Sequence, residues 1–270
     1  MATQEKEMSF LDHLEELRWH LIRAVGALFL FTLIAFVAED FVFKTIIFGP
    51  SRTDFITYKI LCQISEKVGF DVLCIQKLPF TIQSRTLTGQ FTMHVLGSVV
   101  VGLVCAFPYA FWEIWRFVKP GLYAHEQKVT QGATFFVSLL FLIGVGFGYF
   151  ILSPLAINFL SNYQIDPNIA NEFDITSYVS PLATLVLACG LMFQLPMVVY
   201  FLSKIGMLTP EFMRNYRRHS VVVIFIVAAV ITPPDPFSQV LVAMPITLLY
   251  EISIFISARV EKNRLKALKE

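Results

Sequence analysis

Long apolar runs separated by short polar segments fill most of the chain, and this pattern predicts membrane-spanning helices. A helix needs about 20 consecutive apolar residues to cross the hydrocarbon core of a bilayer. The strands of a β-barrel would alternate over about 10 residues instead, which is not the pattern found. We therefore predict an all-α, polytopic membrane protein that forms one concave bundle. The predicted spans are residues 21–37, 91–112, 130–152, 178–202, 220–231 and 240–256.

The fifth and sixth of these six transmembrane helices are predicted to be short. Residues 220–231 number only 12, which is about 18 Å of helix against a hydrocarbon core of about 30 Å. Pro233 and Pro234 force a turn before the sixth span, and Asp235 in that turn is placed to cap the helix that follows. The pair either forms a shallow re-entrant hairpin or lies where the bilayer thins.

An amphipathic helix is predicted ahead of the first span. Ser9 and Asp12 have the spacing of a capping box, and apolar positions then recur at three- and four-residue steps. The opposite, polar face also carries Glu15, Glu16 and His20. This helix either orients the first span at the membrane surface or binds a partner, and the sequence leaves both roles open.

The composition agrees with a membrane protein, because 56% of the residues are hydrophobic and 15% are charged. In soluble domains about 45–50% of the residues are apolar and about 25% are charged. Of the 21 Lys and Arg residues, 15 fall near the termini and after the second and fourth spans, and the other 6 lie in loop 39–90. Positive charge accumulates on the cytoplasmic side of membranes. We therefore predict a membrane domain at 1–258, a basic cytoplasmic tail at 259–270, and an extracytoplasmic loop 39–90 and proline turn.

The sequence holds no catalytic constellation, and we expect no enzyme, no cofactor and no metal site. His125 and Glu126 begin like a zinc-protease motif, but Val129 stands where the second His is needed. His94 and Ser98 lie one helical turn apart. However, no G-x-S-x-G surrounds Ser98, and a Ser in an apolar helix usually bonds its own backbone.

The four cysteines divide into two pairs. Cys105 and Cys189 fall in predicted spans, where they would pack as small apolar residues. Cys62 and Cys74 share loop 39–90, where an oxidising compartment permits a disulfide. The sequence does not decide whether they are bonded.

Polar groups at membrane depth are costly, and Gln194 is the clearest of them. Its amide needs a partner, either within the bundle or on a helix of another protein. The alternative function, an ion-coupled small-solute transporter, would need several ionisable groups around a solvated midplane site. The spans offer only Gln194, His94 and Glu251, which disfavours that function.

Residues 111–128, between the second and third spans, are rich in large side chains and predict a recognition surface. Pro120 and Gly121 fix a turn, and the aromatic rings belong at headgroup level. Glu126 supplies a carboxylate. It either forms a surface ion pair with Lys128 or Arg116, or reads the arginines of a passing peptide.

From about residue 8 to 258 the chain resembles TatC, the multi-span subunit of the twin-arginine (Sec-independent) protein translocase, and three separated motifs in the right order make the resemblance specific. The motifs are FLDHLEELR at 10–18, WRFVKPGLYAHE at 115–126 and TPPDPFSQ at 232–239. The resemblance implies a core receptor in the bacterial cytoplasmic membrane that binds twin-arginine signal peptides at its cytoplasmic face. It further implies export of folded proteins on the proton-motive force, contact with membrane lipid, a homo-oligomer within a larger complex, single-span TatA- and TatB-type partners, and no nucleic acid.

The resemblance also implies which residues bind. The signal-peptide surface would comprise Glu126, Phe117, Glu16, Arg18, Tyr123 and His125. A carboxylate accepts the planar fork of a guanidinium, and an aromatic face attracts the cation. Gln194 matches a position that is often Glu in this family and that contacts the partner helix. Gln keeps the hydrogen bonds but not the charge, which argues against proton transfer there.

Overall fold

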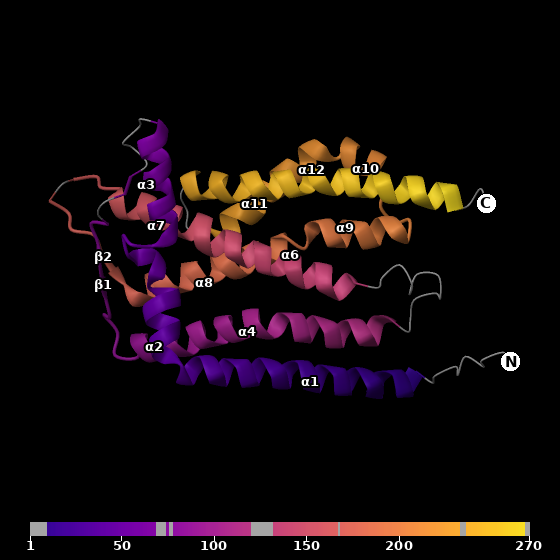
Figure 1. The fold of residues 1–270 in the computed structure, drawn as a ribbon, viewed down its shortest axis with the longest axis horizontal. Coiled ribbons are helices and arrows are strands. Elements are labelled where there is room, and N and C mark those ends of the chain that lie inside the picture. The colour runs from indigo at the N-terminus through magenta and orange to yellow at the C-terminus, as the bar shows by residue number, and fades with distance from the viewer. Residues whose placement is uncertain are drawn as a thin grey trace.

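The computed structural model describes residues 10–68, 74–75, 78–119, 132–166, 168–232 and 236–267. Long helices lie side by side, and α1 begins at the same end of the bundle at which α12 ends (Figure 1). We call this the terminal end, and the opposite end the cap end. The helices of the bundle are α1 (Phe10–Val37), α4 (Gly89–Val118), α6 (Ala133–Phe147), α7 (Ser153–Asn162), α8 (Ile175–Met192), α9 (Leu195–Lys204), α10 (Pro210–Asn215), α11 (Arg217–Ile231) and α12 (Pro236–Ala267).

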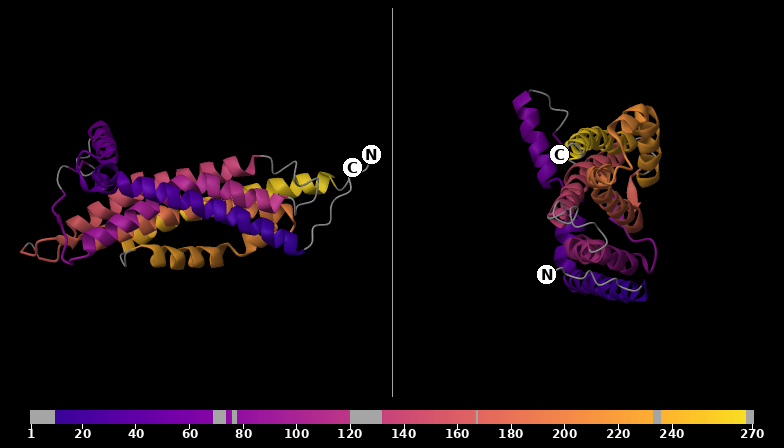
Figure 2. Two further views of the ribbon diagram at one scale, coloured as in Figure 1. Left: turned by 90° about the horizontal axis from the view of Figure 1, so that it is seen from below. Right: turned by 90° about the vertical axis from the view of Figure 1, so that its right-hand side faces the viewer.

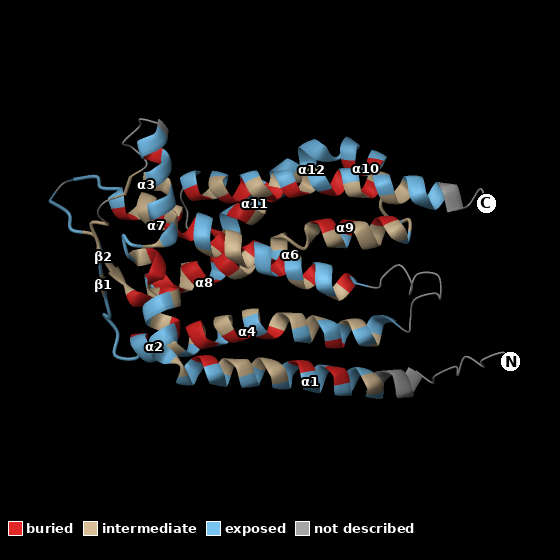
Figure 3. Cartoon of the chain, viewed as in Figure 1, coloured by how far each residue is buried: buried red, intermediate tan, exposed pale blue. Residues whose placement is uncertain are grey.

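The bundle is a row rather than a closed barrel. Helix α1 lies at one edge and packs chiefly on α4, which in turn packs on α6 and α8; α12 packs on α9 and α11 toward the other edge (Figure 2). Within the described residues, five helical stretches are long and apolar enough to cross a membrane. Exposed residues lie along the outward faces of the helices (Figure 3). Many of them are large and apolar, such as Phe29, 69% exposed, and Phe255, 71% exposed. The prediction of a polytopic helical membrane protein is confirmed.

Two predicted spans have different limits in the structure. A π-helical segment, Gly148–Leu152, joins α6 to α7, so this helix continues to Asn162 instead of ending at 152. Pro154 does not stop it, because the first turn of a helix needs no N–H donor there. The predicted span 178–202 is divided into α8 and α9 at Gln194, just before Pro196.

The prediction of a short sixth helix is wrong, although α11 has only 15 residues. Helix α12 has 32 residues and takes in most of the segment predicted as a separate tail. Hydropathy marks only the apolar part of a helix, whereas Glu, Lys and Arg are also good helix formers. Residues such as Glu261, Lys262 and Arg264 therefore prolong α12 beyond its apolar run.

Loop 39–90 is folded into a cap. It contains α2 (Glu39–Phe41), a π-helical segment (Val42–Ile47), a 3₁₀ turn (Gly49–Ser51), α3 (Ile56–Val68) and strand β1 (Thr81–Gln83). Strand β1 pairs in parallel with β2 (Glu172–Asp174). The buried hydroxyl of Tyr58 lies 2.9 Å from the Pro50 carbonyl and 3.0 Å from that of Pro154, which ties α3 to α7. Cys62 and Cys74 are joined as a disulfide.

Small residues allow α6 and α8 to approach closely. A Cβ added at Gly144 would lie 2.6 Å from the Cys189 carbonyl oxygen and 2.9 Å from the Gly190 Cα. These are backbone atoms, which cannot rotate away. A Cβ at Gly146, two residues along the same helix, would meet nothing within 4 Å.

We therefore expect Gly144→Ala to destabilise the protein by about 1–3 kcal/mol, the usual cost of overpacking a tight contact. Gly146→Ala is the matched control and should leave the melting temperature in detergent unchanged or slightly higher, since Ala is the better helix former. Equal melting temperatures for the two variants would contradict the packing described.

Asp174 caps the N-terminus of α8. Its Oδ1 accepts from the Thr176 N–H at 2.9 Å and from the Thr176 hydroxyl at 2.7 Å, while Oδ2 accepts from the Arg85 N–H at 2.9 Å. These donors lower the pKa of Asp174 below its ordinary value, because they favour the carboxylate.

A lowered pKa stabilises the fold above the unfolded value of about 3.9 and loses that effect as the pH falls through the lower folded value. Amide exchange at Thr176 and Arg85 should therefore quicken as the pH is lowered below about 4, after correction for the intrinsic pH dependence of exchange. Asp174→Ala lacks the cap at every pH, so its corrected exchange should already be fast at neutral pH and should not quicken further in acid. Wild-type exchange that stays slow in acid would rule out the capping role.

Candidate functional site

Helices α1 and α4 form an antiparallel pair whose register is set at several depths. Near the cap end, His94 stacks on Phe36 with ring centroids 4.0 Å apart, and its Nε2 lies 3.1 Å from the Phe36 carbonyl oxygen. Midway, a Cβ on Gly102 would lie 2.6 Å from the Thr32 nitrogen, so the two backbones nearly touch. Close approach of this kind is what a glycine in a membrane helix permits.

A buried polar pair joins the same helices toward the terminal end. The His20 Nδ1–H donates to Glu113 Oε2 at 2.5 Å, and the two side chains are 8% and 2% exposed. The Tyr109 hydroxyl donates to Glu113 Oε1 at 3.0 Å. An ionisable group at this depth is costly unless it is paired. Each partner is therefore required to keep the carboxylate buried.

This pair was not predicted from the sequence. His20 was placed on the outward polar face of α1, but it is buried, whereas Leu17 and Leu21 are exposed. The predicted second span ends at 112, which leaves Glu113 outside it. Helix α4 in fact continues to Val118. Extending the helix by one turn would have shown a carboxylate that needs a buried partner.

The next turn toward the terminal end brings Phe117 beside the predicted N-terminal residues. Phe117 is half-buried, with its ring centroid 6.4 Å from that of His20. Glu16 is also half-buried and lies four residues before His20, on the face of α1 that meets α4. Because the helices are antiparallel, their register places Glu16 and Phe117 at the same edge. Arg18 is exposed nearby on α1.

The opposite side of α4 is anchored by aromatic rings. Phe107 stacks on Phe141 of α6 at 3.6 Å between centroids, and Trp115 lies 5.0 Å from Phe201 of α9. Arg116 lies over the Trp112 ring, 4.8 Å from its centroid. The end of α4 is thus held between α1 on one side and α6 and α9 on the other.

Several predicted site residues lie outside the described part of the chain. These are Tyr123, His125 and Glu126 of the predicted peptide surface, and Pro233, Pro234 and Asp235 of the proline turn.

The membrane-depth polar groups have the following partners. Gln194 Nε2 donates to the Val137 carbonyl of α6 at 3.1 Å, while its Oε1 is buried and has no partner among the described residues. Glu251 of α12 accepts from Arg217 of α11 at 2.6 Å. The Ser98 hydroxyl donates to the backbone of His94 at 2.8 Å, which leaves no free nucleophile there.

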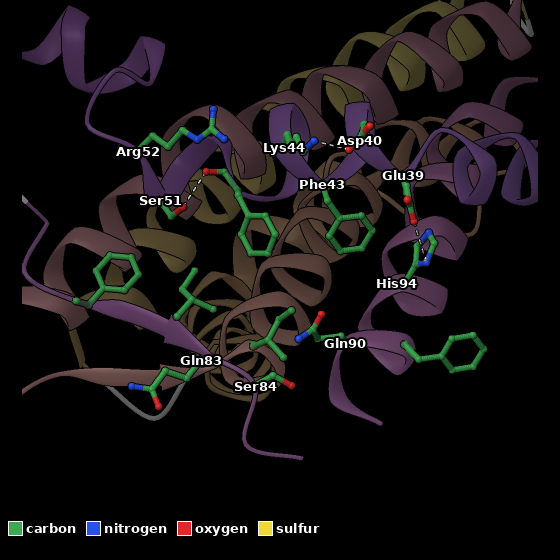
Figure 4. A pocket seen from close by; sticks show the side chains of 15 residues that line it. Glu39, Asp40, Phe43, Lys44, Ser51, Arg52, Gln83, Ser84, Gln90 and His94 are labelled. Carbon is green, nitrogen blue, oxygen red and sulfur yellow. Dashed lines mark hydrogen bonds and ion pairs between the residues drawn. The ribbon is translucent and has the colours of Figure 1, made fainter. Parts of the chain in front are cut away.

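A pocket of about 750 Å³ opens at the cap end, lined by residues of the cap, the start of α4 and Ile175 of α8 (Figure 4). Four of its charged or titratable groups form two close pairs. Lys44 lies 2.5 Å from Asp40, and His94 Nδ1 lies 3.9 Å from Glu39. Across the described residues, no three His, Cys, Asp or Glu side chains gather as a ligand set for a metal ion. The pocket lies at the opposite end of the α1–α4 pair from Phe117.

Comparison with known proteins decides the family. The family model of the Sec-independent protein translocase protein (TatC) matches residues 12–245. The chain belongs to the TatC family. It is 37% identical over 266 residues to TatC of Blattabacterium sp. subsp. Periplaneta americana (strain BPLAN), covering 98% of this chain and 100% of the relative. It is 36% identical over 249 residues to TatC of Helicobacter pylori (strain ATCC 700392 / 26695), covering 92% and 87%.

Solved structures of TatC have the same fold. A crystal structure described as the twin arginine translocase receptor TatC superposes with a TM-score of 0.69 at 32% identity, covering 91% of this chain and 97% of that one. A second, described as the same receptor in DDM, gives a TM-score of 0.70. The chain is therefore a multi-pass membrane component of a Sec-independent translocase, which includes further Tat subunits, and TatC is not a catalytic enzyme.

Proposed function

We propose that the chain is the receptor subunit of a twin-arginine translocase and binds the arginine pair of signal peptides at the terminal end of α1 and α4. The observation that carries this proposal is the antiparallel contact in which His20 of α1 meets both Glu113 and Phe117 of α4. From this register we infer that Glu16, one turn before His20, lies at the same edge as Phe117. One contributes a carboxylate and the other an aromatic face, the two groups that a guanidinium prefers. Glu126, with Tyr123 and His125, completes the surface.

The terminal end would face the cytoplasm of a bacterial inner membrane. Six of the 21 Lys and Arg residues are in loop 39–90, and the others are near the termini or in segments predicted to lie on the terminal side. The disulfide between Cys62 and Cys74 lies in the cap, which suits an oxidising, extracytoplasmic compartment. Helix α1 begins at the end of the bundle at which α12 ends (Figure 1), which supports an even number of crossings, and we propose the short helix α11 as the sixth.

Assembly with single-span TatA- and TatB-type subunits would use Gln194. Its Oε1 is buried and unpaired among the described residues, which is costly in a membrane unless a donor from outside arrives. A donor on a partner helix would satisfy it. Proton-motive force would then drive the export of folded cargo by the assembled complex.

The first prediction concerns peptide recognition. A photo-reactive residue at Phe117 or Glu126 should crosslink strongly to a signal peptide with Arg-Arg and weakly to the same peptide with Lys-Lys, because Lys lacks the planar fork. A probe at Phe29, on the exposed outer face of α1, is the control and should not distinguish the peptides. Equal crosslinking of both peptides at Phe117 would mean that this surface has a structural role and does not recognise the arginine pair.

The second concerns assembly. Gln194→Leu should reduce crosslinking to single-span partners, because Leu has no acceptor for the partner's donor. Gln194→Glu should retain it, since a carboxyl group still accepts. Full partner crosslinking and export by Gln194→Leu would show that the polar contact is dispensable and that the amide serves only Val137.

A further inference from the structure

Glu113 lies between two arginines, one helical turn before Phe117 on α4. Arg23 Nη1 is 3.9 Å from Glu113 Oε2, and Arg116 Nη1 is 4.0 Å from Oε1. Both arginine side chains are 50% exposed, whereas that of Glu113 is 2% exposed. His20 holds the carboxylate from the buried side. A fixed negative charge therefore sits between two positive charges.

These arginines create a difficulty for an arginine-binding surface. Phe117 follows Arg116 directly, and Arg23 lies within one helical turn of His20, which contacts Phe117. Exposed like charges repel one another within about 10 Å at 0.1 M salt. Without a nearby anion, Arg23 and Arg116 would repel the two arginines of an approaching peptide.

We propose that Glu113 is a specificity-determining residue of this surface. Its charge offsets those of Arg23 and Arg116, and its hydrogen bond to His20 keeps it between them. This inference rests on the proposed function, since it concerns the same surface. A stabilising role alone does not require a charged pair, because buried ion pairs can often be replaced by apolar residues without loss of stability.

The test measures binding of fluorescent signal peptides to the full chain in nanodiscs. The peptides carry Arg-Arg, Lys-Lys or an uncharged Gln-Gln pair. The variants are Glu113→Gln, Arg116→Gln and the two combined. Glu251→Gln is the matched control, because it also removes a carboxylate from an arginine, but on α11 and α12, away from α1.

Glu113→Gln should weaken Arg-Arg binding about tenfold at low salt and much less at about 0.5 M salt, where screening is strong. Binding of the Gln-Gln peptide should not change. Combining Glu113→Gln with Arg116→Gln should restore most of the affinity, because one excess positive charge is removed. A purely structural role for Glu113 would show neither the salt dependence nor this rescue.

Other outcomes separate this inference from the proposed function. If wild type prefers Arg-Arg but Glu113→Gln binds it equally well, or if the combined variant binds worse than Glu113→Gln, the inference is wrong and the receptor function stands. If wild type shows no preference for Arg-Arg, both fall. Should Glu113→Gln not fold, Arg116→Gln alone still tests the idea. It should bind Arg-Arg at least as tightly as wild type at low salt, and weaker binding would overturn the proposal.

Discussion

The antiparallel pairing of α1 with α4 is the constraint on which the candidate site depends. Helix α1 lies at the edge of the row and packs chiefly on α4, so its position is fixed mainly by that one contact. Gly102 lets the backbones approach, and His20 with Glu113 fixes the register near the terminal end. A slip of one residue would rotate Glu16 away from Phe117, because neighbouring residues on a helix point about 100° apart.

The end of α4 shows why this register is stable. Apolar packing against lipid-like surroundings does not favour one register strongly, since lipid tails are as apolar as the side chains. Hydrogen bonds and ring contacts are directional and therefore favour one register. The hydrogen bonds to Glu113 face α1, while Trp115 meets Phe201 of α9 on the other side. In the proposed site, the half-buried ring of Phe117 would be held by these contacts and would lose little conformational entropy on binding.

The sequence predicted a polytopic helical membrane protein correctly, because hydropathy is a local property. Motifs are local too, and they name candidate site residues. Phe117 and Glu16 could be named from their motifs alone. The pairing of His20 with Glu113 could not, since the residues are 93 positions apart and only the packing of α1 on α4 brings them together. Helix ends were also misjudged. In α12 the apolar residues end before the helix does. In the predicted span 178–202, the hydropathy is continuous although the helix is divided just before Pro196.

The distribution of charge within the spans fits the proposed division between peptide recognition and partner assembly. Position 194 carries an amide, which can exchange hydrogen bonds but cannot carry a proton at ordinary pH. The buried carboxylate at Glu113 instead lies among cations at the terminal end. A neutral hydrogen-bonding group suits contact with an apolar helix, because no charge has to be desolvated. A fixed charge suits recognition of a cationic peptide at the water-facing end.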